Sequence, residues 1–595
     1  MKPDMRYLAD LLQPDPTGAP QIRLRQGVVQ STSAGPSPTA TVTIGGSSTS
    51  IAGVRMLGSY TPTATDVVQI LQNGTDLLIL GTLVASGSVL SGTGIDPTGT
   101  TDSGAALQAK MNADTTNEPY LPAGTYVTST SLTIPAGKRL TLAKGATLRG
   151  TAGLTVVAVA ADATLFGGTV DGGTALYCTS ITGDRARIDT VTISNGTYGV
   201  GHGNSFADLT VERCRFFNNT SYGVLVENAA VRTMIRGNTF LSTTNASQQG
   251  VTVKNNTGGT PVDTSIVDNV VDVPGIIGLE AQAGSLRIVI TGNVVRRATI
   301  GISLSSAKSV SVTGNTIVGC STYGIEAAQA TADSTISGNT VISCGTGICV
   351  TSPTSSPASI NVNVIGNTIT NASGYGIQVE FGGGHTIANN TIADPVGIAI
   401  FLNNGPIECH VSGNHVRRSV TSGNCIQCNS GSNNTYSGNS LQFVGGGGGY
   451  GIYSNGEAEV GLFGNSVAGG QKAYAFTSAS NARVIGNSSR NTTEHSIFTQ
   501  TMTNIFVDAH YYSNNGGVGI DLSGASAGRL GTYMDTTSGN STWAGQQHTS
   551  SKLGLYGVAP VVRAPSIPSP TSDTVGTKAA IDALRTAVFN LGITL

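Results

Sequence analysis

The stretch Ser309-Val310-Ser311-Val312-Thr313-Gly314-Asn315-Thr316-Ile317-Val318, followed by Tyr323-Gly324-Ile325-Glu326-Ala327-Ala328, decides the fold. Apolar and polar residues alternate on both sides of Gly314-Asn315 and again after Gly324, as in strands that bury one face. The glycines mark turns, and no segment has the apolar spacing of a long helix. The stretch therefore predicts two or three short strands joined by tight turns.

Both phrases of this stretch recur along the chain. The Gly-Asn phrase returns at 237–238, 292–293, 314–315, 338–339, 366–367, 413–414, 438–439, 464–465 and 486–487. The glycine-strand phrase lies between the copies, for example at 198–200, 222–224, 277–279, 323–325, 375–377 and 450–452. From Gly168 to Asn487 the mean step is about 24.5 residues. Such units must stack to bury their apolar faces, so we expect a right-handed parallel β-helix of about 14 rungs.

The asparagine of each Gly-Asn phrase has a predicted role. A side-chain amide carries both a donor and an acceptor, so asparagines at one turn position can bond to those on the rungs above and below. The preceding glycine allows a backbone with positive φ. We expect an asparagine ladder along one edge of the β-helix.

The flanking segments predict further parts. Residues 20–84 alternate as about five strands, at 22–30, 39–44, 50–57, 67–72 and 76–83, with a hairpin turn at Asn73-Gly74. We expect a small β domain at 1–88, a linker and cap at 89–150, the β-helix at 151–510, a C-terminal β region at 511–564 and a C-terminal segment at 565–595. A helix is predicted at about 577–590, with apolar residues on a/d spacing that could help to join chains.

Composition excludes several classes of protein. The formal net charge is −2 and only 11% of the residues are charged, so no basic field for nucleic acid exists. No apolar run is long enough to cross a membrane, and the N-terminal residues Met1 to Arg6 lack the apolar core of a secretory signal. The eight cysteines do not have the spacing of a small disulfide framework. Nothing in the pattern indicates a cofactor or a metal site.

Two flanking phrases carry a family resemblance. Residues 95–108, Ile-Asp-Pro-Thr-Gly-Thr-Thr-Asp-Ser-Gly-Ala-Ala-Leu-Gln, followed by Tyr120-Leu121-Pro122-Ala123-Gly124-Thr125-Tyr126, resemble the start of the pectate-lyase-like β-helix of phage tailspikes. Residues 552–565, Lys-Leu-Gly-Leu-Tyr-Gly-Val-Ala-Pro-Val-Val-Arg-Ala-Pro, resemble a phrase near the C-termini of tail-fibre proteins from phages of high-GC Gram-positive bacteria. The 20–84 segment resembles the small OB-like barrel of tail and baseplate proteins from the same phages, which implies an OB-like β-barrel at 1–88.

Candidate catalytic residues are few. Hydrolysis of a glycosidic bond uses two carboxyl groups, and Glu280 and Glu326 both follow a strand glycine by two residues, at an outward position. Their expected separation is about 10 Å along one column. Glu227 and Glu380 share another column, and Asp171, Asp184 and Glu212 form a third set. Outward strand positions are often charged, so all of these residues also fit a structural role.

Three other patterns invite a functional interpretation. The residue before the strand glycine is a tyrosine on five rungs, at Tyr198, Tyr222, Tyr323, Tyr375 and Tyr450. An exposed column of tyrosines would suit stacking on sugars. The alternation of the strands favours packing of these side chains instead. Gly201-His202-Gly203 resembles a polygalacturonase motif, but the accompanying Asp motifs are missing. Cys425 and Cys428, with Cys409 and His410, could suggest zinc, yet a second cysteine pair is absent.

The resemblance implies a phage tail spike or minor tail fibre. Such a protein would be a homotrimer on the virion, attached by its barrel to other tail or baseplate proteins, and would bind host cell-wall polysaccharide during adsorption. Tyr323 and Tyr375 are the candidate glycan-binding residues, and Glu280 and Glu326 are the candidate catalytic residues if the protein is a depolymerase. The alternatives are a secreted polysaccharide lyase or glycoside hydrolase, and a purely structural tail spacer.

Overall fold

The computed structural model describes residues 22–535 and residue 586, except for 34–38, 45–46, 58–61, 65, 74, 85–88, 152, 202–204, 243–247, 257–258, 351–357, 420–422, 446–447, 518 and 532. The chain divides into two compact units, Met1–Ala298 and Thr299–Leu595. The predicted C-terminal helix and the phrase at 552–565 lie outside the described residues, apart from Thr586.

The first unit begins with a closed five-stranded barrel in the order β1-β2-β3-β5-β4. Its strands are β1 (Ile22–Ser33), β2 (Thr39–Ile44), β3 (Ser50–Met56), β4 (Val67–Asn73) and β5 (Asp76–Val84). Alternate residues of the strands, including Val29, Val42, Val54, Val68 and Ile70, fill one apolar core. The predicted strands and the OB-like barrel are confirmed.

The same unit then enters a parallel coil through a capping helix. Helix α2 (Gly104–Ala113) buries Leu107 and Met111, which lie one turn apart on the same side. Before the helix, Asp96 accepts hydrogen bonds from the backbone N–H groups of Thr98, Thr100 and Thr101, which order the turn of the predicted starting motif.

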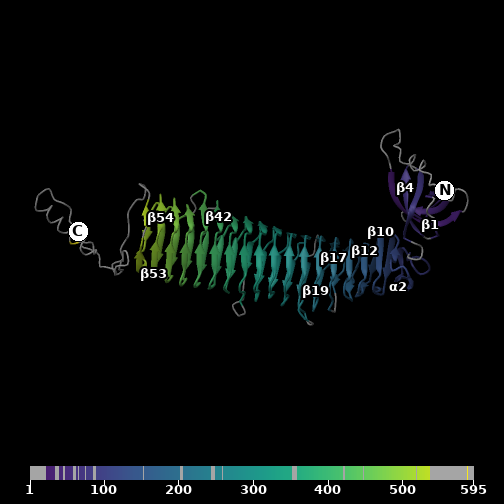
Figure 1. Cartoon of the computed structure of the whole chain (residues 1–595), viewed down its shortest axis with the longest axis horizontal. Coiled ribbons are helices and arrows are strands. Elements are labelled where there is room, and N and C mark those ends of the chain that lie inside the picture. The colour runs from purple at the N-terminus through teal and green to yellow at the C-terminus, as the bar shows by residue number, and fades with distance from the viewer. Residues whose placement is uncertain are drawn as a thin grey trace, which may run out of the picture. The chain divides into compact units, whose positions relative to one another are not determined.

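Each rung of the coil contributes to two sheets (Figure 1). One sheet, here called sheet C, takes one longer strand per rung: β9 (Leu132–Ile134), β11 (Thr155–Val159), β13 (Tyr177–Ile181), β16 (Tyr198–Gly201), β19 (Tyr222–Glu227), β22 (Gln249–Lys254) and β25 (Ile277–Gln282). The other, sheet B, takes two three-residue strands on most rungs, such as β17 (Thr210–Glu212) and β18 (Arg215–Phe217).

The second unit has the same architecture. Its sheet C strands are β28 (Ile300–Ser305), β31 (Tyr323–Ala328), β34 (Thr346–Val350), β37 (Ile377–Glu380), β40 (Ile400–Asn403), β43 (Ile426–Asn429), β46 (Tyr450–Asn455), β49 (Lys472–Thr477), β52 (Ile497–Gln500) and β55 (Ile520–Asp521). The quoted stretch forms β29 (Ser311–Thr313) and β30 (Thr316–Val318) of sheet B, followed by β31. The predicted all-β fold with a parallel β-helix is confirmed, and parallel strands also lie outside the expected limits of 168 and 487.

The asparagine ladder is present in both units. In the second unit it contains Asn315, Asn339, Asn367, Asn390, Asn414, Asn439, Asn465 and Asn487, each at most 1% exposed. The Oδ1 atom of Asn367 accepts from both the backbone N and Nδ2 of Asn339, at 3.0 and 2.9 Å. The glycine before most of these asparagines has positive φ, for example 62° at Gly338. Each asparagine thus satisfies buried backbone groups of neighbouring rungs.

The strand glycines have a different role. A Cβ atom on Gly324 would lie 2.5 Å from the carbonyl oxygen of Gly347 and 2.4 Å from Cγ1 of the buried Val341. Gly324 therefore faces the interior, as does Ile325 two positions after Tyr323. The residues of β31 that pair with the next rung are Tyr323, Ile325, Glu326 and Ala327, so the ladder skips Gly324 and simple alternation fails there. The alternation that favours packing of the tyrosines therefore does not hold at Tyr323, which is half-buried.

Candidate functional site

The outward face of sheet C in the second unit carries a column of polar and aromatic side chains. In register, its members are Ser303, Glu326, Cys349, Gln378, Phe401, Gln427 and Tyr453. Parallel pairing places successive members about 4.8 Å apart. Ser303 and Cys349 are buried in this column, and Glu326 is half-buried.

Glu326 has an environment that favours its protonated form. Burial raises the pKa of its carboxyl group, although a hydrogen bond of 3.3 Å from the Ser303 hydroxyl opposes the shift. Burial, Cys349 and the charges of Glu326 and Glu380 raise the pKa of Tyr323 to about 12. Burial and the same carboxylates raise the pKa of the Cys349 thiol, so it is not a thiolate nucleophile at neutral pH.

Glu380 completes an acidic cluster with Glu326. It lies at the end of β37, two rungs from Glu326 and two residues further along the strand. This offset separates the two Cα atoms by about 12 Å. Gln378 donates to Oε1 of Glu380 at 2.6 Å and so orients that carboxylate toward the column. A carboxyl group with a raised pKa and a second carboxylate are the components that acid–base hydrolysis needs.

The same face continues with aromatic rings and amides. The rings of Tyr375 and Phe401 lie 5.0 Å apart at 43°, and Tyr450 and Tyr453 form an edge-on pair at 5.2 Å. Amide side chains run between the rings: Gln427 donates to Asn429 at 3.0 Å, Asn429 donates to Asn403 at 3.1 Å, and Asn424 donates to Gln427 at 2.7 Å. Flat apolar rings beside fixed amide donors and acceptors suit a neutral sugar chain.

Glu280 belongs to the first unit, where it lies on β25. It is 4% exposed and accepts a hydrogen bond of 3.2 Å from Thr252. On the first unit, Tyr177, Tyr198 and Tyr222 stack on one another with centroids 4.8 and 5.6 Å apart. The faces of those three rings contact one another. Tyr323 differs, because its neighbours on the adjacent rungs are Ile300 and Thr346, which have no aromatic ring.

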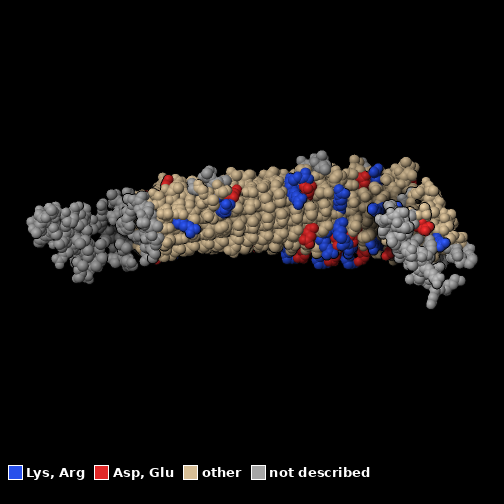
Figure 2. Space-filling view, turned by 90° about the horizontal axis from the view of Figure 1, so that it is seen from above, with Lys and Arg blue, Asp and Glu red and all other residues tan. Residues whose placement is uncertain are grey.

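The acidic set of the first unit is held by ion pairs and hydrogen bonds. Glu212 is fully buried and contacts Arg187, Arg213 and Arg236. Asp171 accepts from Arg149 at 3.0 Å, and Asp184 accepts from the backbone N–H of Ala207 at 2.8 Å. On the face in Figure 2, charged side chains gather over one part of the β-helix and are sparse elsewhere. These contacts support a structural role for Asp171, Asp184 and Glu212.

The cysteine pattern does not form a metal site. Cys425 lies near Arg418, whereas Cys428 contacts Asn434 and lies close to Glu457. Within the described ranges no group of three His, Cys, Asp or Glu residues could hold a metal ion. His202 falls outside those ranges. In the part of the chain that the structure describes, no helix is long and apolar enough to span a bilayer.

Sequence reasoning identified Glu326, Tyr323 and Tyr375 but missed their partners. Glu380 lies in another column than Glu326, as the sequence predicts, and no motif in the sequence marks Phe401, Gln427 or Asn429. Aligning all strands on the glycine phrase could have found these residues, because their columns are continuous. The ring pair of Tyr375 and Phe401 could not have been found, since Tyr375 lies before its strand.

Comparisons with known proteins agree with the fold. A family model, "Right handed beta helix region", matches residues 277–392. The catalytic unit of a GH87 α-1,3-glucanase from Streptomyces thermodiastaticus is 17% identical with a TM-score of 0.48, covering 64% of this chain and 84% of that one. No curated protein sequence matches the chain.

Two bacteriophage structures are also similar. The phi29 gene product 12 N-terminal fragment is 14% identical with a TM-score of 0.40, covering 82% of this chain and 97% of that one. The Dettilon tailspike protein is 14% identical with a TM-score of 0.33, covering 70% of this chain and 69% of that one. At these identities the similarity concerns the fold. The protein contains a right-handed parallel β-helix.

Proposed function

We propose that this protein binds polysaccharide along the outward face of sheet C in its second unit. The observation that carries this proposal is the run of fixed amides and aromatic rings from Tyr375 to Asn455 on successive rungs. A β-helix presents such a run as a straight track, so consecutive sugars of one chain can meet equivalent side chains. Amide pairs that are already hydrogen-bonded lose little rotamer entropy on binding.

The biological setting that we propose is a phage tail spike or tail fibre. The sequence phrases at 95–126 and 552–565 support it, together with the OB-like barrel, which would attach the protein to other tail proteins. The ligand would be a host cell-surface glycan, and the protein would act as a homotrimer on the virion. Antibodies against the protein should label the tails of purified phage particles; light scattering should give three times the chain mass. Unlabelled tails or a monomeric mass would contradict these two points respectively.

Binding can be tested with polysaccharide extracted from the cell wall of a candidate host. Calorimetric titration of the whole chain should show binding that Gln427→Ala and Tyr375→Ala each weaken by about tenfold, because an amide pair or a ring face is lost. Thr335→Ala on the outward face of sheet B is a matched control and should bind normally. Equal binding by all four proteins would contradict the sheet C site.

Cleavage of the bound chain is a second candidate function, which the raised pKa of Glu326 favours. Glu326 would donate its proton to the leaving glycosidic oxygen, and Glu380 would accept a proton from the water that attacks the sugar carbon. Incubation with the polysaccharide should then release reducing ends, and Glu326→Gln should abolish the release while leaving binding in place. Glu280→Gln tests the other sequence candidate. Release that persists in Glu326→Gln would exclude this assignment.

A further inference from the structure

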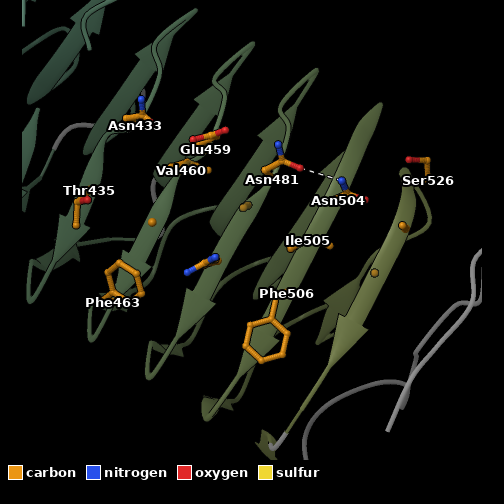
Figure 3. Close-up of a pocket in the computed structure, with 15 residues that line it drawn as sticks. Asn433, Thr435, Glu459, Val460, Phe463, Asn481, Asn504, Ile505, Phe506 and Ser526 are labelled. Carbon is orange, nitrogen blue, oxygen red and sulfur yellow. Dashed lines mark hydrogen bonds between the residues drawn. The ribbon is translucent and has the colours of Figure 1, made fainter. Parts of the chain in front are cut away.

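A depression on sheet B of the second unit is distinct from the sheet C face. It crosses β44 (Thr435–Ser437), β47 (Gly461–Phe463), β50 (Ala482–Ile485), β53 (Met502–Asp508) and β56 (Ala525–Leu530), and has a volume of about 1030 Å³. Figure 3 shows Asn433, Glu459, Asn481 and Asn504 in a row along one side of it, with Phe463 and Phe506 on the other. None of these residues takes part in the site described above.

One column in the depression has a glycine, Gly461, where the neighbouring rungs have side chains. Thr435, Gly461, Arg483 and Phe506 occupy equivalent outward positions on four successive rungs. A Cβ atom at Gly461 would lie 2.5 Å from the ring of Phe463, so the ring lies across the glycine. Phe463 and Phe506 are both half-buried, two rungs apart. Their backbones are thus about 10 Å or more apart, which leaves room for a sugar ring between the two aromatic side chains.

Arg483 lies on the rung between the two rings and is exposed. In the first unit, exposed arginines at a turn of the coil pair with aspartates on the adjacent rung, as Arg232 does with Asp208 at 2.7 Å. Arg483 takes part in no such ion pair among the described residues. A guanidinium group presents a planar fork of donors that matches a carboxylate. Its charge is therefore available to an acidic ligand.

The rim supplies hydrogen-bonding groups for hydroxyls. Asn504 donates to Oδ1 of Asn481 at 2.8 Å, which leaves free donors and acceptors on both amides. Glu459 is exposed on the same row and can accept from hydroxyl groups. A single arginine beside a glutamate is too little charge for nucleic acid. Rings, amides and one cation together match an acidic sugar.

We propose that this depression binds an acidic residue of a polysaccharide, with its carboxylate on Arg483, its ring against Phe463 and Phe506, and its hydroxyls on Asn481 and Asn504. The site goes beyond the proposed function, because it lies on another sheet and selects for charge. Together with the sheet C face it would hold one branched polymer, or two neighbouring chains, at two points. Such two-point attachment raises the apparent affinity without stronger individual contacts.

The test uses the whole chain and a decamer of galacturonic acid as probe, with its methyl-esterified form as the neutral counterpart. Titration should show about tenfold weaker binding of the ester, and Arg483→Gln should weaken binding of the acid to the same level. Arg490→Gln, which removes an exposed arginine outside the depression, is the matched control. Glu459→Gln should strengthen binding of the acid, because a like charge is removed.

Three outcomes would overturn the proposal. The first is equal binding of the acid and the ester, and the second is that Arg490→Gln weakens binding of the acid as much as Arg483→Gln does. The third is that Phe506→Ala changes the oligomeric state measured by light scattering, in which case a second copy of the chain occupies the depression. The test is separable from the proposed function. Tyr375→Ala should leave binding of the decamer intact, and failure of the depression would leave host-polysaccharide binding by sheet C untouched.

Discussion

The asparagine ladder makes a strong prediction about Asn367. Replacement of Asn367 by Leu keeps the number and branching of the side-chain heavy atoms but removes four hydrogen bonds, to Asn339 N and Nδ2, to the carbonyl of Ile336 and to Oδ1 of Asn390. The backbone N–H of Asn339 and one hydrogen of its amide then have no acceptor in a site that is 1% exposed.

The magnitude follows from these two orphaned donors. An unsatisfied buried donor costs about 1–3 kcal/mol, so we expect a loss of about 4 kcal/mol for the neighbouring rungs. In a stacked coil this loss is local, and hydrogen exchange reports it better than a global melting curve. A loss of about 4 kcal/mol corresponds to about 10³-fold faster exchange of the amides at 335–342.

The matched control is Asn363→Leu, on the outward side of the same sheet in β35 (Asn363–Ile365), where the side chain is half-exposed. It should change stability by less than about 0.5 kcal/mol. Exchange at 335–342 that rises by less than tenfold in Asn367→Leu, or that rises equally in both variants, would refute the ladder as a source of stability.

Further predictions concern other buried positions. Gly324→Ala should lower the melting temperature measured by circular dichroism more than Gly338→Ala, because only Gly324 lacks room for a Cβ atom. Burial raises the pKa of the Glu457 carboxyl group, so the stability that this group contributes is complete below the usual glutamate pKa and is lost as the pH rises through the raised value. Glu457→Gln should therefore make the melting temperature less dependent on pH above the usual glutamate pKa. Burial lowers the pKa of His385 to about 4, so stability falls as pH drops from the usual histidine pKa toward that value. His385→Asn should remove this acid sensitivity and keep the bond from the backbone N–H of Val362, as Asn434 does for Cys409.

The sequence alone determined the architecture, because the residues that recur in the repeat have specific local roles in strands and turns. Alternation predicted the strands of the quoted stretch and of the barrel, and the column of asparagines predicted the ladder. These features depend on backbone conformation and on hydrogen bonding between equivalent positions, which a period in the sequence reveals directly.

Only the tertiary structure decided which side chains meet on the surface. The inward glycine at 324 turned Tyr323 outward, and the stacking of β31, β34 and β37 brought Glu326 and Glu380 into one cluster. The depression at Gly461 likewise depends on Phe463 folding across a neighbouring backbone. The burial and the direction of a side chain depend on residues of the adjacent rungs, about 24 positions away in the chain. The sequence of a single strand therefore does not predict them.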